Sequence, residues 1–326
     1  MLSVKIVGLG KYLPKKVLTN HDLERMVDTS DEWITTRTGI KRRRIVEGES
    51  ASDLGTKAAR RAIKAAAVKP EDIELIIVAT ITPDTQFPST ACYIQKNIGA
   101  KKAAVFDVSA ACSGFVYALA VAKGMISAGL YKNALVVGSE ILSSITDWSD
   151  RSTCVLFGDG AGAAVVVPTT ESKGILGIHL GGDGNLADLL ILPAGGSRLP
   201  VSKSTVENRQ HYIKMRGNEV FKIAVKIMVD TVVKALANSK LRPQDIDLLV
   251  PHQANLRIIN AVAKRLGLEE NRVFVNINKY GNMSSASTAV ALCEAYESGR
   301  IKKGDIVALD TFGGGLVWAS CIIRWD

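Results

Sequence analysis

Residues 70–78 read Pro-Glu-Asp-Ile-Glu-Leu-Ile-Ile-Val, and residues 243–250 read Pro-Gln-Asp-Ile-Asp-Leu-Leu-Val. In each stretch a proline that marks a turn is followed by a short acidic segment and then by an apolar run typical of a buried strand. Matching stretches so far apart in one chain indicate that its two halves share a fold.

An amphipathic helix is expected before each of these turns. Over residues 53–68, small and apolar side chains recur every four positions from Leu54 to Ala66, and basic side chains fall elsewhere. Residues 219–241 have the same character, with a polar stripe that includes Lys222 and Lys226. The order helix, turn and buried strand therefore occurs twice.

The repeat continues downstream of the first strand. An apolar strand is expected over residues 103–108, just before Ser-Ala-Ala-Cys-Ser-Gly, and an alanine-rich helix over residues 115–128. In the second half the corresponding segments are a strand over residues 273–277 and a helix over residues 286–298, with Tyr-Gly-Asn-Met-Ser-Ser between them.

A third match pairs residues 157–167 with residues 312–323, both of which begin Phe-Gly. Gly-Asp-Gly-Ala-Gly at residues 158–162 precedes an apolar strand expected over residues 163–167, so it does not join a strand to a helix as a dinucleotide-binding loop does. Three matches in the same order predict a duplicated α/β fold. We place the halves at residues 1–170 and 171–326.

The composition excludes several classes of protein. The chain has 326 residues, 47% hydrophobic and 22% charged, which is typical of a globular protein rather than a disordered or fibrous one. The longest uncharged runs, residues 108–122 and 280–293, are shorter than the roughly 18 to 20 residues of a membrane span. No secretory signal is evident, so we expect a cytoplasmic protein that does not bind membranes.

Charge indicates the kind of partner, and cysteine content indicates whether disulfides or a metal site are expected. The 41 Lys and Arg residues exceed the 32 Asp and Glu residues, which gives a net charge of +9 and predicts attraction to an acidic partner. A nucleic acid is disfavoured, because only 6% of the residues are aromatic and no nucleic-acid-reading motif is present. Five cysteines without a Cys-X-X-Cys pair argue against a disulfide framework and against a zinc site, so no metal is expected.

Chemistry in such folds is expected beyond the carboxyl ends of the strands. Cys112 lies there among small residues, at the start of a helix whose dipole would favour a thiolate. His252 follows the strand over residues 247–250, and Asn282 lies between Gly281 and Met283. Each residue alone has an ordinary structural interpretation, but a duplication brings all three toward one site.

These three segments resemble the active-site motifs of one enzyme family. Asp-Val-Ser-Ala-Ala-Cys-Ser-Gly-Phe at residues 107–115, Pro-His-Gln-Ala-Asn-Leu-Arg at 251–257 and Asn-Lys-Tyr-Gly-Asn-Met-Ser-Ser-Ala-Ser at 278–287 are similar to those of β-ketoacyl-acyl-carrier-protein synthase III. The resemblance spans the chain. It implies a thiolase-like fold of two related halves, with mixed, mostly parallel sheets and helices in α-β-α-β-α layers.

The resemblance also implies a reaction. A short acyl group moves from acyl-CoA to Cys112, and malonyl-carrier protein then loses carbon dioxide and condenses with it in the first step of fatty acid synthesis. Neutral His252 and the amide of Asn282 would stabilise the enolate, and the backbone N–H groups of Cys112 and Gly314 would form a second oxyanion hole. CoA is part of a substrate here, so no cofactor is expected.

Further positions acquire expected roles in the same way. Trp33, Arg37 and Arg151 match residues that hold the CoA adenine and phosphates, and Phe87 matches a residue that reaches across a homodimer and limits the acyl pocket. The positions that match the patch where the acidic carrier protein docks are Lys222, Arg257, Lys264 and Arg265.

Other enzyme classes differ from this chain at defined positions. A degradative thiolase would carry a second cysteine in the glycine motif at residues 313–315, and an elongating synthase would have two histidines in place of His252 and Asn282. A 3-hydroxy-3-methylglutaryl-CoA synthase would need a glutamate near residues 79–84. A related acyl-CoA-primed ketosynthase or acyltransferase of secondary metabolism with another acceptor, and a cysteine hydrolase that releases the acyl group to water, stay open.

Overall fold

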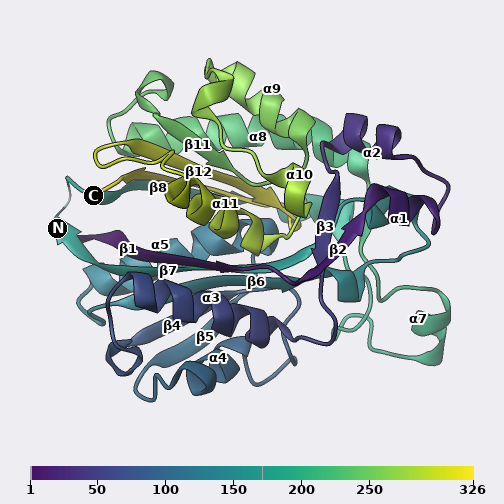
Figure 1. Ribbon diagram of the computed structural model, residues 1–326, viewed down its shortest axis with the longest axis horizontal. Helices are drawn as coiled ribbons and strands as arrows, with labels where there is room; N and C mark the ends of the chain where they lie inside the picture. The colour runs from purple at the N-terminus through teal and green to yellow at the C-terminus, as the bar shows by residue number, and fades with distance from the viewer. Residues whose placement is uncertain (1, 171) are drawn as a thin grey trace.

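The computed structural model describes residues 2–170 and 172–326 and has five layers, in which helices and sheets alternate (Figure 1). Helices α3 and α4 cover the outer face of one sheet, α8 and α9 cover the outer face of the other, and α5 and α11 lie between the sheets. This is the α-β-α-β-α arrangement expected from the sequence. The helices have the following bounds: α1 Asn20–Glu24, α2 Asp31–Thr38, α3 Ala51–Ala65, α4 Thr90–Ile98, α5 Gly114–Ser127, α6 Arg151–Cys154, α7 Lys203–Glu207, α8 Gly217–Asn238, α9 Leu256–Leu266, α10 Ile277–Tyr280 and α11 Ser285–Glu297.

The first sheet has the strand order β1-β7-β6-β4-β5. Strand β4 pairs in parallel with β5 and β6, whereas β7 pairs antiparallel with β6 and β1. Its strands are β1 Leu2–Tyr12, β4 Leu75–Ala79, β5 Ala104–Val108, β6 Ala134–Ile141 and β7 Asp159–Thr170.

The second sheet has the order β11-β12-β13-β8. Only β11 and β12 pair in parallel, so antiparallel pairs are more frequent than expected from the sequence. Its strands are β8 Gly174–Gly182, β11 Leu248–Pro251, β12 Ile306–Gly313 and β13 Val317–Arg324. Two further sheets have two strands each: β2 Lys16–Thr19 with β3 Arg42–Ile45, and β9 Leu190–Ile191 with β10 Lys214–Met215. Strand β7 ends at Thr170, while the boundary that we placed there between two halves stays a prediction.

The two stretches that suggested the repeat adopt the same local structure. Pro70–Asp72 and Pro243–Asp245 each form a short 3₁₀ helix, and each is followed by a fully buried strand, β4 or β11. The 3₁₀ helices are η1 Pro70–Asp72, η2 Ala111–Ser113, η3 Leu142–Ile145, η4 Gly184–Leu189, η5 Pro243–Asp245 and η6 Glu270–Arg272.

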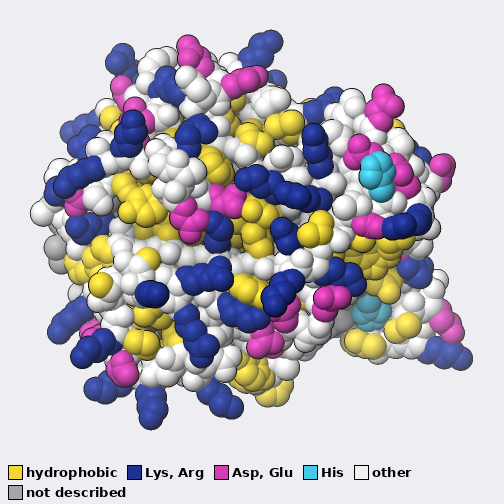
Figure 2. All heavy atoms as spheres, in the orientation of Figure 1, with side chains coloured by type: hydrophobic (Ala, Val, Ile, Leu, Met, Phe, Trp, Pro, Cys, Tyr) yellow, Lys and Arg dark blue, Asp and Glu magenta, His cyan; other side chains and the backbone are white. Residues whose placement is uncertain are grey.

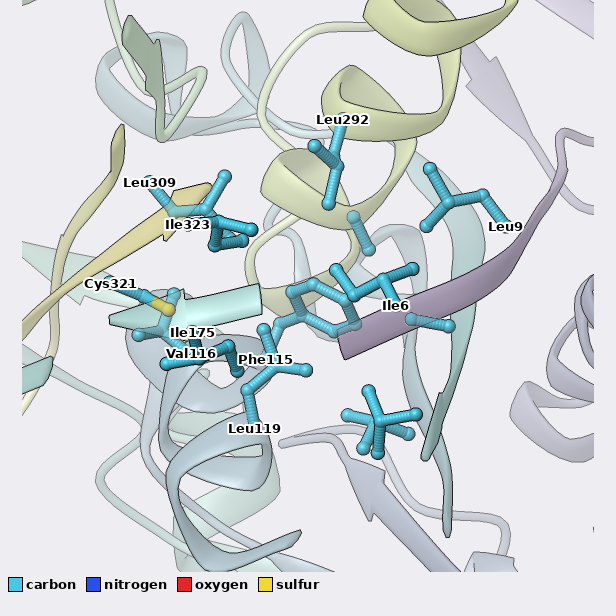
Figure 3. Close-up of a cluster of buried hydrophobic side chains, with 14 of the residues drawn as sticks. Ile6, Leu9, Phe115, Val116, Leu119, Ile175, Leu292, Leu309, Cys321 and Ile323 are labelled. Carbon is cyan, nitrogen blue, oxygen red and sulfur yellow. The ribbon is translucent and has the colours of Figure 1, made fainter. Parts of the chain in front are cut away.

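The middle layer holds the largest buried hydrophobic cluster. Phe115 and Leu119 of α5 and Leu292 of α11 pack between Ile6 of β1 and Ile323 of β13 (Figure 3). Burial of one such side chain contributes about 1.5–3 kcal/mol to stability. Because α5 starts beside Cys112 and α11 starts beside Asn282, this cluster fixes both helix starts in one place.

The prediction of a strand over residues 273–277 is wrong. Only Val273 forms a bridge, to Leu249, and the chain then turns into α10. The side-chain oxygen of Gln253 accepts hydrogen bonds from the backbone N–H groups of Asn276 and Ile277, at 2.9 and 3.1 Å. These contacts draw the backbone away from the sheet, which a local apolar pattern could not indicate.

The strand expected over residues 163–167 is longer than predicted, because β7 already begins at Asp159 within the glycine-rich segment. The glycines allow close packing on this strand: a Cβ at Gly162 would lie 2.5 Å from the Cβ of Ala289 on α11, and one at Gly160 would lie 2.6 Å from the sulfur of Met283. The segment thus brings β7 against the residues that follow Asn282.

Across the described ranges, 2–170 and 172–326, no helix combines the length and apolar character needed to cross a bilayer.

Candidate active site

Cys112 lies on η2, between the end of β5 and the start of α5, and its side chain is buried. The preceding residue, Ala111, has a φ of +43°, a strained conformation for a residue with a Cβ. On the other side, a Cβ at Gly313 would lie only 2.7 Å from the backbone nitrogen of Cys112. The glycine turn after β12 therefore packs directly against the cysteine.

The electrostatics of Cys112 differ from the sequence expectation. Burial raises the pKa of the Cys112 thiol to about 12, so desolvation outweighs the helix start that was expected to favour a thiolate. A nearby Ser284 hydroxyl opposes this rise. The thiol therefore needs a proton acceptor in the site in order to act as a nucleophile.

His252 follows the last residue of β11, and its backbone N–H donates to Asp310 O at 2.7 Å. Burial lowers the pKa of the His252 imidazole to about 3, so the ring is neutral at physiological pH. Among residues 2–170 and 172–326, neither ring nitrogen has a hydrogen-bond partner. A buried imidazole with both nitrogens unpaired is suited to bind or exchange a proton with a ligand.

Asn282 is held by its backbone to the segment before β7. Its N–H donates to Leu156 O, its carbonyl accepts from Gly158 N–H, and both distances are 2.9 Å. Its side-chain oxygen accepts the backbone N–H of Ser284 at 2.8 Å. That bond leaves the amide nitrogen as the group free to donate toward a ligand.

These three residues line one cavity of about 900 Å³. Gly313 and Gly314 also line it, and so do apolar side chains such as Leu142 and Phe157. Cys112 and Asn282 come from the ends of segments that pack on the first sheet, and His252 from the second sheet. The structure thus places the candidate nucleophile, base and amide donor around a single space.

Trp33 and Arg37 lie on α2 and line the same cavity. The Arg151 guanidinium lies 4.2 Å from the centre of the Trp33 ring, and that of Arg37 lies 5.6 Å from it. All three expected CoA contacts therefore form one cluster, although Arg151 itself is not among the residues that line the cavity.

The basic residues expected to receive a carrier protein fall into two groups. Lys222 and Arg257 are exposed and line the cavity, with Arg257 over the Phe221 ring at 5.4 Å. Lys264 and Arg265 are exposed on the last turn of α9, outside the cavity. Lys and Arg side chains also spread over the face that carries β1, α3 and α11, so charge alone does not locate this patch (Figure 2).

Phe87 does not line the cavity of its own chain. It lies in the loop between β4 and α4 and is 87% exposed, so it is not packed in the core of its own chain. An aromatic side chain with this exposure is suited to packing against another surface.

Sequence reasoning missed three polar residues that support the site. Asn255 caps α9 by accepting from Arg257 N–H at 2.8 Å and donates to Arg37 O at 3.0 Å, which joins α9 to α2. Ser284 has a φ of +46°, and its hydroxyl is buried close to Cys112. Glu140 is fully buried on β6. The sequence shows that these polar residues lie in apolar segments, but it does not show which groups they contact.

In the part of the chain that the structure describes, no group of three or more His, Cys, Asp or Glu side chains could hold a metal ion.

The chain is similar to known proteins over its whole length. Residues 106–184 match the family model 3-oxoacyl-[acyl-carrier-protein (ACP)] synthase III, and residues 236–325 match the model of its C-terminal part. The β-ketoacyl-[acyl-carrier-protein] synthase III of Caldanaerobacter subterraneus subsp. tengcongensis is 57% identical over all of this chain and 98% of that protein. The protein of the same name from Clostridioides difficile is 56% identical over 98% of each chain.

Solved structures are similar over the whole chain. The 3-oxoacyl-[acyl-carrier-protein] synthase III of Aquifex aeolicus matches with a TM-score of 0.92 and 48% identity, over 99% of this chain and 100% of that one. The priming β-ketosynthase of the R1128 polyketide biosynthetic pathway matches with a TM-score of 0.91 and 37% identity, over 99% and 97% of the two chains.

Proposed function

The chain belongs to the 3-oxoacyl-[acyl-carrier-protein] synthase III family, and we propose that Cys112, His252 and Asn282 carry its condensation reaction. Members of this family are acyltransferases that condense acyl groups in fatty acid biosynthesis. The observation that supports the residue roles best is the convergence of a buried thiol, an unpaired neutral imidazole and an amide N–H on one cavity.

The first half-reaction is acyl transfer to Cys112. The sulfur attacks the carbonyl carbon of acyl-CoA, a new C–S bond forms, and CoA leaves as the old C–S bond breaks. The thiol proton passes to neutral His252 and ends on the CoA sulfur. The backbone N–H groups of Cys112 and Gly314 would stabilise the oxyanion, since both residues line the cavity.

The second half-reaction is decarboxylative condensation. Malonyl-carrier protein loses carbon dioxide, and the enolate carbon attacks the acyl-Cys112 carbonyl, which releases the sulfur and gives a 3-oxoacyl product. Neutral His252 and the Asn282 amide donate hydrogen bonds to the enolate oxygen. Loss of one such donor costs about 2.7–4 kcal/mol of transition-state stabilisation.

The CoA moiety would bind at the cluster on α2. Trp33 offers a ring face for the adenine, and Arg37 and Arg151 offer guanidinium groups for phosphates. No separate cofactor is needed, because both carbon fragments arrive as thioesters.

The carrier protein would dock beside the cavity mouth, on Lys222, Arg257, Lys264 and Arg265. Two of these residues line the cavity and the other two continue the basic surface along α9. The net charge of +9 favours an acidic partner, although rim charges affect association rates more than affinity.

We also propose a homodimer in the cytoplasm, in which Phe87 enters the acyl pocket of the second copy. The support is the exposure of this apolar side chain on the loop that includes Ile81, a residue that lines the cavity. Within each copy, residues 1–170 would supply Cys112, and residues 171–326 would supply His252 and Asn282.

A priming ketosynthase of secondary metabolism is the second candidate, because the R1128 enzyme shares this fold at 37% identity. Product analysis tests whether malonyl-carrier protein is the acceptor. With acetyl-CoA and malonyl-carrier protein, mass spectrometry of the carrier should detect a 3-oxoacyl thioester that Cys112→Ala does not form. Free acid without a carrier-bound product would instead indicate a hydrolase, and absence of both would contradict the proposed acceptor.

A further inference from the structure

Glu140 is a buried carboxyl group that the reaction described above does not use. It lies near the end of β6 and has no exposed surface. No Lys, Arg or His forms an ion pair or hydrogen bond with it among the described residues. The titratable group that faces it is the Cys112 thiol, whose pKa is raised by the charge of an ionised Glu140.

One oxygen of Glu140 is well supplied with donors. Oε2 accepts from Ile81 N–H at 3.1 Å, from the Thr82 hydroxyl at 2.9 Å and from the Thr80 hydroxyl at 3.3 Å. Both threonine hydroxyls themselves accept a backbone N–H, so their own protons are free for Glu140. Oε2 therefore acts as an acceptor only.

The other oxygen has a different environment. Oε1 lies 2.9 Å from the Ser285 hydroxyl, which lies 2.8 Å from the carbonyl oxygen of Ala79. A serine hydroxyl has one proton, so it cannot donate to both oxygens. If Glu140 were ionised, either Oε1 or the Ala79 carbonyl oxygen would lie against a lone pair of the Ser285 hydroxyl instead of its proton, which is unfavourable for a buried acceptor. A proton on Oε1 removes the conflict, because Oε1–H donates to Ser285 and Ser285 donates to Ala79.

Ser284 agrees with this assignment. Its buried hydroxyl lies close to Cys112 and Glu140 and lowers the pKa of either group. An ionised Glu140 would compete for this single proton. A neutral Glu140 leaves the hydroxyl free to donate to the Cys112 sulfur as negative charge develops there.

We propose that Glu140 is held as a neutral carboxylic acid and is a positioning residue for the site, which directs the Ser284 hydroxyl to Cys112 and ties the Thr80–Thr82 loop to Ser285. The role deepens the proposed function, since it concerns activation of the same nucleophile. Burial raises the pKa of Glu140, in agreement with the hydrogen-bond count.

The protonation state is directly measurable. Infrared difference spectra of the full-length protein at neutral pH, wild type minus Glu140→Gln, should contain the carbonyl band of a protonated carboxylic acid. The subtraction removes other buried acids, such as Asp310, that are present in both proteins. A difference spectrum with carboxylate bands and no acid band would overturn the proposal.

The effect on Cys112 is measured by its alkylation with iodoacetamide as a function of pH. Glutamine reproduces the donor and acceptor pattern of the neutral acid, so Glu140→Gln should keep the neutral-pH rate within about twofold. Removal of an ionised carboxylate would instead speed alkylation about tenfold or more, and that result would overturn the proposal. Ser284→Ala should slow alkylation about tenfold.

These measurements are independent of the condensation itself. If acyl-CoA does not acylate Cys112 while the acid band is present, the proposed function fails and the state of Glu140 stands. If acylation occurs and the band is absent, the reverse holds. Thermal unfolding of each variant ensures that only folded proteins are compared.

Discussion

The side-chain oxygen of Asn282 accepts the backbone N–H of Ser284 at 2.8 Å, which fixes the orientation of the amide and leaves its nitrogen for the cavity. Asn282→Asp would keep this bond but lose the donor. We therefore expect condensation to fall about 10²- to 10³-fold, while acylation of Cys112 by acyl-CoA stays close to normal. Single-turnover assays of the two half-reactions measure the split, and equal losses in both would contradict the assigned role.

The approach of Gly313 to Cys112 leads to a second prediction. A Cβ at Gly313 would lie 2.7 Å from the Cys112 nitrogen and 3.0 Å from its Cβ, so Gly313→Ala should displace the nucleophile and slow its acylation. Gly124→Ala on α5 is the control, because a Cβ there meets no atom within 4 Å. The control should add up to about 1 kcal/mol of stability and leave acylation unaffected. Similar acylation rates in the two variants would refute the close approach.

The buried neutral His252 predicts how stability depends on pH. Because its folded pKa, about 3, lies below the ordinary value of 6.5, the unfolded chain binds an extra proton between these values. The free energy of unfolding should therefore fall as the pH falls from about 6.5 toward 3, and His252→Gln should lose less stability over this range. Denaturant titrations at pH 7 and pH 5 provide the comparison. Parallel losses in both proteins would show that His252 is not buried in its neutral form.

The basic surface near the cavity predicts a selective defect. Arg257→Glu with Lys264→Glu should raise the KM for malonyl-carrier protein and reduce its salt dependence, and acylation by acyl-CoA should change little. Lys64→Glu, on α3 in the opposite outer layer, reverses the same type of charge elsewhere and is the control. An equal rise in KM with the control would indicate only a general charge effect.

Phe87 permits a test of exchange between subunits. In a heterodimer of Phe87→Ala and Cys112→Ala chains, the reactive Cys112 is on the chain that lacks Phe87. If Phe87 acts on the partner's pocket, the acyl-CoA preference of this heterodimer should match that of wild type, whereas the Phe87→Ala homodimer should accept bulkier primers. A heterodimer with the preference of the Phe87→Ala homodimer would place the residue in its own pocket.

The repeat could be predicted from local sequence pattern, whereas the layers and the roles of the three candidate active-site residues were expected from motifs that resemble those of the family. A strand was wrongly predicted over residues 273–277 because the side-chain oxygen of Gln253, about 20 residues earlier, accepts hydrogen bonds from the backbone N–H groups of Asn276 and Ile277. The raised pKa of the Cys112 thiol could not be predicted for a similar reason, since it depends on burial in the folded chain. Glu140 was not recognised because its role depends on how many donors reach each oxygen, which only the folded structure specifies.

The central claim is that Cys112 carries the acyl group between the two substrates, and intact-protein mass spectrometry tests it most directly. After incubation with a panel of short straight and branched acyl-CoAs, the protein should gain the mass of one acyl group and lose it when malonyl-carrier protein is added. Cys112→Ala should gain nothing, whereas Cys154→Ala, which removes another buried thiol, should be acylated like wild type. An adduct that persists in Cys112→Ala, or no adduct with any acyl-CoA, would contradict the account.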